Sequence, residues 1–196
     1  MGTTATLTSP RRCPRSLRPS AQHRCFLAVL LIALLATACS SGVAASPTTE
    51  APLPAGPTPS KIATQICRSP AIQDIETTVG VAASISTPTW ADHLYSCTYR
   101  YPNGSMVLSV KELSSWTQTK AYFEQLGRQM GDARILRGLG QAAFQTTDGS
   151  MVVRKDWKVL LVDTAGLPSQ FGQPPTSSGE VAVTVADVIL GCWDGD

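Results

Sequence analysis

Residues 93–113 read HLYSCTYRYPNGSMVLSVKEL, two runs of alternating apolar and polar residues around an Asn-Gly pair. Asn103-Gly104 is typical of a two-residue type I′ turn, in which both residues take a positive φ. Such a turn pairs Tyr101 with Met106, and the pairing continues outward along both strands. One face of the hairpin then carries six largely apolar side chains: Cys97, Tyr99, Tyr101, Met106, Leu108 and Val110. We therefore predict an antiparallel hairpin with this face buried.

A second hairpin and a further strand are predicted downstream. Residues 142–155 read AAFQTTDGSMVVRK, with a turn at Asp148-Gly149, and residues 158–163 read KVLLVD. Short apolar runs bounded by turn residues are typical of strands joined by tight turns.

Three segments carry helical signals. Residues 69–80 have proline in the first turn and glycine at the end, which favours a helix between them. Residues 177–193 begin with a capping box, Ser177 and Glu180. Residues 114–131 place four apolar side chains on one helical face: Trp116, Phe123, Leu126 and Met130.

These segments together predict an α+β fold in the order α-β-β-α-β-β-β-α. Consecutive strands joined by tight turns indicate an antiparallel sheet of about five strands, made of two hairpins and one further strand. We expect the three helices to pack mainly on one face of that sheet.

The charge of the chain is unevenly distributed. Residues 1–38 contain five arginines and no acid, whereas the rest of the chain has 11 basic and 14 acidic residues, a net charge of −3. A weakly acidic surface gives no electrostatic reason to bind nucleic acid, or to adhere to anionic lipid. We therefore expect no nucleic-acid partner.

The basic start of the chain precedes an apolar run, FLAVLLIALLATA, at residues 26–38. This order is typical of a secretory signal peptide, which we assign to residues 1–38. A retained membrane anchor is the alternative, but the run has 13 residues, whereas a membrane-spanning helix needs about 20.

The residues around the expected cleavage site, LATAC at 35–39, resemble a bacterial lipobox, although Ala36 stands where leucine is usual. In a lipobox the cysteine becomes the acylated N-terminus, so we expect Cys39 to be lipidated and the bilayer to be a partner. Acyl chains bind lipid by about 0.8 kcal/mol for each buried methylene. The protein is then lipid-anchored on the extracytoplasmic face of the cell membrane. Cleavage after Ala38 without lipidation is the alternative.

Beyond Cys39 the sequence changes character. Residues 40–60 contain five prolines and one charge, without hydrophobic periodicity, which predicts a disordered tether. We therefore divide the mature chain into a lipidated N-terminus with its tether, residues 39–60, and a single α+β domain, residues 61–196.

Three cysteines lie in that domain: Cys67, Cys97 and Cys192. In an oxidising compartment any one of three single disulfides is open to them. A bridge between Cys67 and Cys97 would join the first helix to the sheet. Cys192 lies on the apolar side of the last helix, where it is either an inert buried thiol or a disulfide partner.

Candidate catalytic residues are few. The mature chain has one histidine, His93, at the start of a predicted strand and next to Asp92. No G-x-S-x-G nucleophile motif accompanies it. The three scattered cysteines lack zinc-ligand spacing. We therefore predict no catalytic residue, metal or cofactor site.

Two other motifs can be interpreted functionally. GLGQAA, residues 138–143, matches the glycine pattern of a dinucleotide site, but a strand rather than a helix is predicted to follow it, so a closely packed turn is expected instead. Trp157 lies in the tight turn KDWK, residues 155–158. An aromatic side chain at a loop tip can anchor a partner, so Trp157 is a candidate contact.

The combination of the lipobox cysteine, the Pro/Thr tether, a cysteine ahead of the first helix, YSCTYRYP, GLGQAAF and the closing GCW resembles the secreted lipoproteins of actinobacteria. Among them it is similar to the small domains of unknown function in which an N-terminal helix cysteine bridges to the first strand. The resemblance implies an envelope location and a Cys67–Cys97 disulfide. It implies no catalytic residue.

We therefore expect a non-enzymatic binding or interaction domain in the cell envelope, whose partner is an envelope protein or an apolar ligand. An interaction module should expose an apolar patch, around Trp157 for example. A carrier of lipid or another apolar ligand should have a cavity between sheet and helices. A hydrolase should have a polar cleft in which acids such as Asp92 converge with His93.

Overall fold

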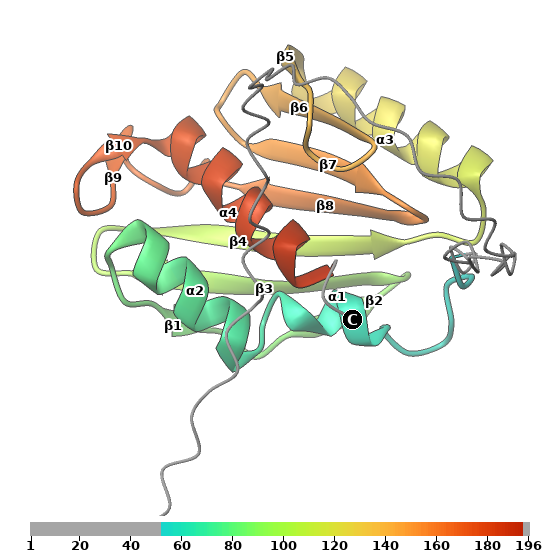
Figure 1. The fold of residues 1–196 in the computed structure, drawn as a ribbon, viewed down its shortest axis with the longest axis horizontal. Coiled ribbons are helices and arrows are strands. Elements are labelled where there is room, and N and C mark those ends of the chain that lie inside the picture. Colours follow the sequence, from blue (N-terminus) through green and yellow to red (C-terminus); the bar gives the residue numbers. More distant parts are fainter. Residues whose placement is uncertain (1–51, 194–196) are drawn as a thin grey trace, which may run out of the picture. The chain divides into compact units, whose positions relative to one another are not determined.

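The computed structural model describes residues 52–193, with the backbone alone at residues 132 and 133. These residues form an eight-stranded antiparallel sheet in the order β1-β3-β4-β8-β7-β6-β5, with β2 also paired to β3 (Figure 1). The elements are α1 (Lys61–Gln65), α2 (Ser69–Val79), β1 (Ser84–Ile85), β2 (Thr89–Ala91), β3 (Leu94–Tyr101), β4 (Gly104–Glu112), α3 (Trp116–Met130), β5 (Asp132–Leu136), β6 (Ala142–Thr146), β7 (Met151–Lys155), β8 (Lys158–Asp163), β9 (Gln170–Phe171), β10 (Thr176–Ser177) and α4 (Ser178–Trp193).

The α+β class is confirmed, but the predicted number of elements is too low. The described part of the chain has four helices, and its main sheet has eight strands where about five were expected. The additional elements are α1 and β5, with five residues each, and β1 and β2, with two and three residues; β9 and β10, of two residues each, lie outside the main sheet. Segments this short show no sequence periodicity.

The β3–β4 hairpin has the predicted buried face but a different register. Tyr101 lies opposite Gly104 instead of Met106, so the two-residue loop is Pro102-Asn103. In the predicted hairpin Pro102 and Ser105 would form a hydrogen-bonded pair that exchanges two N–H···O bonds, and Pro102 has no N–H for one of them. A shift of two residues leaves every side chain on its predicted face, and all six predicted inward residues are buried: Cys97, Tyr99, Tyr101, Met106, Leu108 and Val110.

The second hairpin and the third strand are confirmed as β6, β7 and β8. At the turn, Thr146 N–H donates to the Ser150 carbonyl over 2.9 Å, and Gly149 has a φ of 92°. Strand β8 then pairs with β4, so the two halves of the sheet join through strands that are far apart in sequence.

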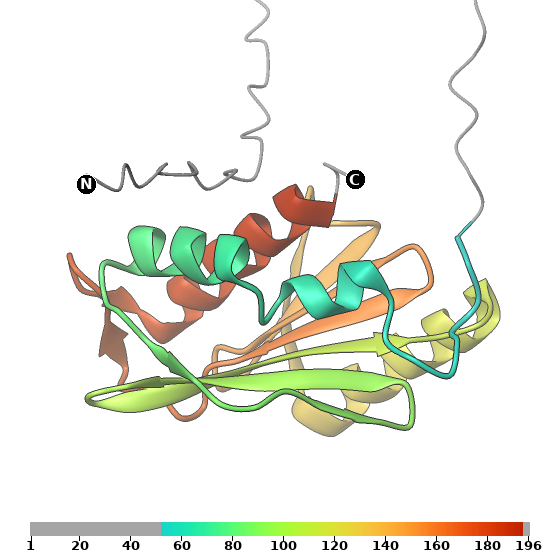
Figure 2. The same cartoon turned by 90° about the horizontal axis from the view of Figure 1, so that it is seen from below.

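Helices cover both faces of the sheet (Figure 2). Helices α1, α2 and α4 pack on the face that carries Tyr99 and Leu108, whereas α3 packs on the opposite face against Phe144. The expected packing mainly on one face therefore holds through α2 and α4, and α3 is the exception. The physical reason lies in the middle of the sheet, where the neighbours Val152 and Val153 are both fully buried. A strand that is apolar on both sides needs cover on both faces.

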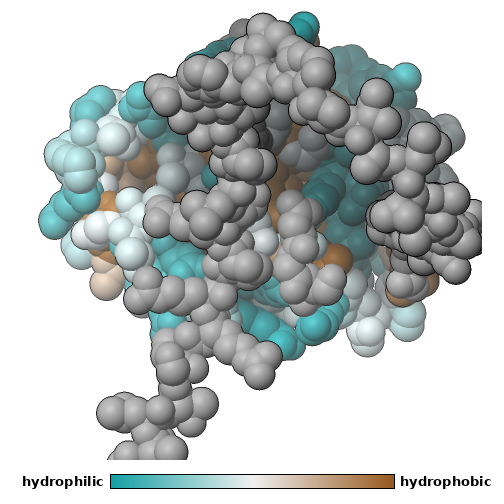
Figure 3. All heavy atoms as spheres, viewed as in Figure 1, coloured by the Kyte–Doolittle hydropathy of each residue, from teal (hydrophilic) through white to brown (hydrophobic). Residues whose placement is uncertain are grey.

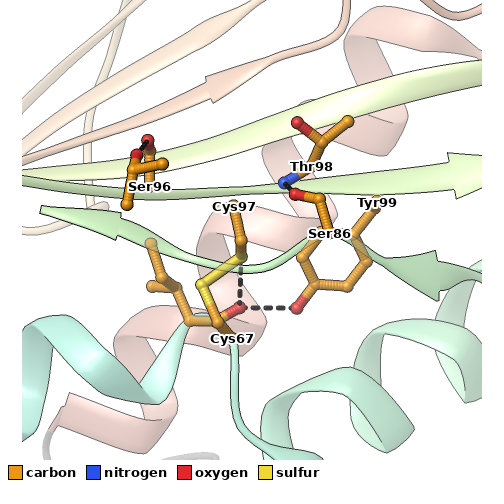
Figure 4. The surroundings of a disulfide bond; sticks show 8 residues. Cys67, Ser86, Ser96, Cys97, Thr98 and Tyr99 are labelled. Carbon is orange, nitrogen blue, oxygen red and sulfur yellow. Dashed lines mark hydrogen bonds between the residues drawn. A yellow bond between two sulfur atoms is a disulfide. The ribbon is translucent and has the colours of Figure 1, made fainter.

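A disulfide joins Cys67, between α1 and α2, to Cys97 on β3, with a Cα–Cα distance of 6.2 Å (Figure 4). Beside it, the Tyr99 hydroxyl donates to the Ile66 carbonyl over 2.6 Å. Burial is the main cause that raises the pKa of Tyr99. The pairing implied by the resemblance is therefore confirmed, and Cys192, buried on α4, is the partner of neither cysteine.

The last residues of the expected tether, 57–60, lie against the domain. The Trp90 indole N–H donates to the Pro57 carbonyl over 3.0 Å. The Ser60 N–H donates to Glu112 Oε2 over 3.1 Å, and the Ser60 hydroxyl caps α1. Within the described residues, the end of the tether is thus held to the domain by specific hydrogen bonds.

Candidate binding cleft

A cleft of about 410 Å³ lies at the β5 edge of the sheet, between α3 and the β5–β6 hairpin. It is lined by Phe123 of α3, Ile135 and Leu136 of β5, the loop 137–141, and the first residues of β6, which include Ala142. Figure 1 shows β5, β6 and α3 together at one edge of the sheet. The loop 137–141 therefore supplies nearly half of the lining residues, and β5, β6 and α3 supply the rest.

The loop 137–141 depends on its glycines. Gly138 and Gly140 have φ angles of 85° and 54°, which favour glycine. A Cβ on Gly140 would lie 2.7 Å from the carbonyl oxygen of Arg154, and that oxygen accepts the N–H of Gln141 over 2.8 Å. The predicted closely packed turn is confirmed, and strand β6 follows it where a dinucleotide site needs a helix.

One wall of the cleft is apolar and open to solvent. The Ile135 side chain is 78% exposed, although it lies opposite Phe144 in the β5–β6 ladder. The Phe144 ring contacts the Phe123 ring edge to face, with 4.9 Å between ring centroids. An exposed aliphatic side chain thus adjoins an aromatic pair of which Phe144 is buried and Phe123 half-buried, an arrangement that favours contact with an apolar group.

Arg154, on β7, lies beside this wall and is only 9% exposed. Its guanidinium carbon is 3.9 Å from the centroid of the Trp116 ring and 5.7 Å from that of Phe123. Among the described residues, Nε and Nη1 of Arg154 have no hydrogen-bond partner. Burial lowers the pKa of Arg154, and the carboxylate of Glu124 partly opposes this effect. Arginine nevertheless stays protonated at neutral pH, so the buried group is a cation.

Among the described residues that line the cleft, Arg137 is the only charged one and none is acidic. Asp156, outside the lining, is hydrogen-bonded to the lining residue Gln141. The nearby Glu124 already pairs with Lys120, with 3.7 Å between Nζ and Oε1. Apolar walls with one buried and one lining cation suit a ligand that is apolar and carries a negative charge.

The residues predicted as sites lie elsewhere. Trp157 is half-buried in the two-residue loop between β7 and β8, and its carbonyl accepts the Leu113 N–H over 2.9 Å. The Cys67–Cys97 disulfide is on the opposite face of the sheet, beneath α1. Cys39 lies outside the described residues.

Asp92 and His93 form the turn between β2 and β3. Both have a positive φ, 50° and 57°, as a type I′ turn requires. The His93 Nδ1 is hydrogen-bonded to the Gly56 carbonyl over 3.0 Å, and its ring meets Trp90 edge to face. Both residues are exposed, and neither lines the cleft.

Sequence reasoning missed Arg154, Ile135 and Phe123 as site residues. The sequence places Phe123 on a helix face and residues 138–143 in a turn. Nothing in either pattern indicates that the helix and the turn lie side by side. One signal was available: Arg154 follows three buried apolar residues in SMVVRK. A charge in such a run marks either the end of a strand or a buried cation.

On the face seen in Figure 3, hydrophobic residues are scattered among hydrophilic ones. Within residues 52–193, no cluster of three His, Cys, Asp or Glu side chains is arranged to hold a metal ion. The helices described between these residues are too short or too polar to cross a membrane.

The chain was compared with protein-family models, curated proteins and solved structures, and it matches none of them.

Proposed function

We propose that this chain is a lipid-anchored extracytoplasmic protein whose domain is a non-catalytic binding module, and that the cleft beside α3 is its binding site. The membrane location is supported by the signal-like residues 1–38 and by Cys39 in a lipobox-like context. The binding role is supported by the cleft.

The observation that carries the binding role is an open apolar cleft at the β5 edge of the sheet. Its volume of about 410 Å³ is in the range of small-molecule sites, roughly 300–1,000 Å³. Ile135 is exposed within it, and its neighbours Phe123 and Phe144 pack against each other. Apolar surface that stays open on a folded domain marks a contact site.

Two kinds of ligand fit a binding module, an envelope protein or an apolar small molecule. The position of the cleft, between α3 and the sheet, favours the second, which makes the protein a carrier of an apolar ligand. Phe123 and Phe144 enclose one end of such a site from helix and strand. A protein partner would need more surface than this cleft supplies.

Native mass spectrometry of the protein, extracted from its own membrane in mild detergent, tests both parts of the proposal. We expect a mature N-terminus at Cys39 that carries acyl mass, and an additional mass that is lost on denaturation. The variant Ile135→Ser should lose that additional mass. Leu53→Ser should retain it, because Leu53 is similarly exposed, 74% against 78% for Ile135, but does not line the cleft.

Two outcomes would contradict the proposal. Unmodified protein in the culture medium would remove the lipid anchor. Equal retention of bound mass or bound partner in the Ile135→Ser and Leu53→Ser variants would place the binding site outside the cleft.

A further inference from the structure

We infer that the cleft binds a single-chain amphiphile with one anionic head group, that Arg154 receives the head group, and that Phe123 and Ile135 contact the chain. This inference rests on the proposed function and adds the chemical class of the ligand. A fatty acid is the simplest molecule of this class.

Arg154 is a buried cation with hydrogen-bond donors that lack a partner among the described residues. Its side chain is nine-tenths buried, and Nε and Nη1 have no hydrogen-bond partner among the described residues. Charged donors without a partner are costly to bury, and buried charges in proteins are ordinarily paired. The Trp116 ring covers one face of the guanidinium but supplies no acceptor. A carboxylate would satisfy the free donors.

Arg154 lies next to residues that line the cleft. In the β6–β7 ladder Arg154 lies directly opposite Ala142, so the two side chains share a face of the sheet. Arg154 does not itself line the cleft, but two of its neighbours do. Ala142, whose side chain is a single methyl group, lies opposite it, and the Phe123 ring lies 5.7 Å from its guanidinium carbon. We therefore place the anion at this end of the cleft, beside Ala142 and Phe123, as the position from which it can approach Arg154.

The charge and the size of the cleft limit the ligands that it can bind. The described residues that line the cleft include Arg137 and no acid. A cationic head group would have no acid among these lining residues to pair with, and a neutral one would leave the Arg154 donors without partners. The size of the cleft, near the lower end of the range for small-molecule sites, favours one acyl chain over the two chains of a phospholipid.

The test uses the full mature chain, held through its anchor in nanodiscs of zwitterionic phosphatidylcholine. Decanoate, decan-1-ol and decyltrimethylammonium have the same chain length but different head-group charges, and each is titrated calorimetrically. Empty nanodiscs correct for partition into lipid. We expect decanoate to bind about tenfold more tightly than decan-1-ol, because a charge-assisted hydrogen bond is gained. Decyltrimethylammonium should bind most weakly.

Variants locate the head group. Arg154→Gln should lower decanoate affinity to the level of decan-1-ol and leave decan-1-ol binding unchanged, and the retained alcohol binding shows that the variant is folded. The matched control is Arg100→Gln, since Arg100 is exposed on β3 and does not line the cleft. That control should bind decanoate as the wild type does.

Other results would overturn the inference. If acid and alcohol bind equally and Ile135→Ser weakens both, the cleft stands as the binding site but its ligand is not anionic. If decanoate binding disappears in nanodiscs of anionic phosphatidylglycerol, the site takes a phospholipid head group instead of a single-chain acid. If no probe binds above the empty nanodiscs, the ligand class is wrong, and the native mass spectra decide separately whether the proposed function survives.

Discussion

The guanidinium of Arg154 stacks on the indole ring of Trp116, with 3.9 Å between the guanidinium carbon and the ring centroid. This contact joins the first residue of α3 to strand β7. Trp116 remains 47% exposed, so its ring covers the cation from the solvent side. The same pair therefore contributes to the packing of α3 and shields the candidate head-group site.

Replacing Trp116 by alanine should lower the free energy of unfolding by about 1 kcal/mol, the magnitude of a partly desolvated cation–π contact. Trp116→Phe should lose less, because a smaller ring still covers the guanidinium. Urea unfolding of both variants, followed by circular dichroism, measures the difference. Wild-type stability in Trp116→Ala would show that the stack does not stabilise the fold.

Replacing Arg154 by methionine should leave the free energy of unfolding within about 1 kcal/mol of wild type, or increase it. The reason is that an apolar side chain of similar length removes a buried cation without partners and still packs on Trp116. The same urea titration measures this effect. A loss of more than about 2 kcal/mol would make Arg154 a structural residue and weaken its assignment to a ligand.

Removal of the Cys67–Cys97 disulfide should destabilise the domain by about 3–4 kcal/mol. The two cysteines are 30 residues apart, and a crosslink over a loop of this length lowers the entropy of the unfolded chain by that amount. The double variant Cys67→Ala/Cys97→Ala is compared with wild type by urea unfolding under oxidising conditions. A change below about 1 kcal/mol would show that local packing, with the Tyr99 hydrogen bond to Ile66, holds α1 and α2 without the crosslink.

The stability of the domain should fall as the pH rises above about 10, the ordinary pKa of tyrosine. Burial raises the pKa of Tyr99 in the folded state, so folding favours the protonated hydroxyl. That contribution is complete below the pKa of the unfolded chain and is lost as the pH rises toward the folded value. The slope of unfolding free energy against pH in this range should be smaller for Tyr99→Phe.

Tyr95→Phe is the matched control for this pH dependence, because burial raises the pKa of Tyr95 as well but Arg68 offsets part of that effect. It should keep most of the alkaline loss of stability. Identical slopes in wild type and Tyr99→Phe would assign the alkaline transition to other groups, such as Tyr101, whose pKa is also raised by burial.

The candidate site shows where sequence reasoning ends. GLGQAA could be predicted as a closely packed turn, because the glycines and the following alternation are local features. The sequence could not predict that this turn borders a cleft, because the cleft forms only where Phe123 of α3 lies next to β6. Arg154 stands near the end of its strand, where arginine is ordinarily exposed. Only the packing of α3 across β7 buries it.

The sequence by itself determined the features that neighbouring residues control. The inward face of residues 93–113, the strands at 142–163 and the Ser177–Glu180 capping box of α4 follow from alternation, turn residues and capping side chains. These act over a few residues, so no distant partner is needed. A local residue, Pro102, also disfavours the predicted register of the first hairpin, because its missing N–H removes one hydrogen bond beside the Asn103-Gly104 turn.

Only the tertiary structure decided which distant segments meet. The pairing of β4 with β8, the placement of α3 on the opposite face and the approach of Arg154 to Trp116 all join residues from separate elements. Such contacts form because apolar surface on both faces of the central strands must be buried, and several arrangements of the same local elements could bury it. Packing of the whole chain selects one of them, and with it the cleft.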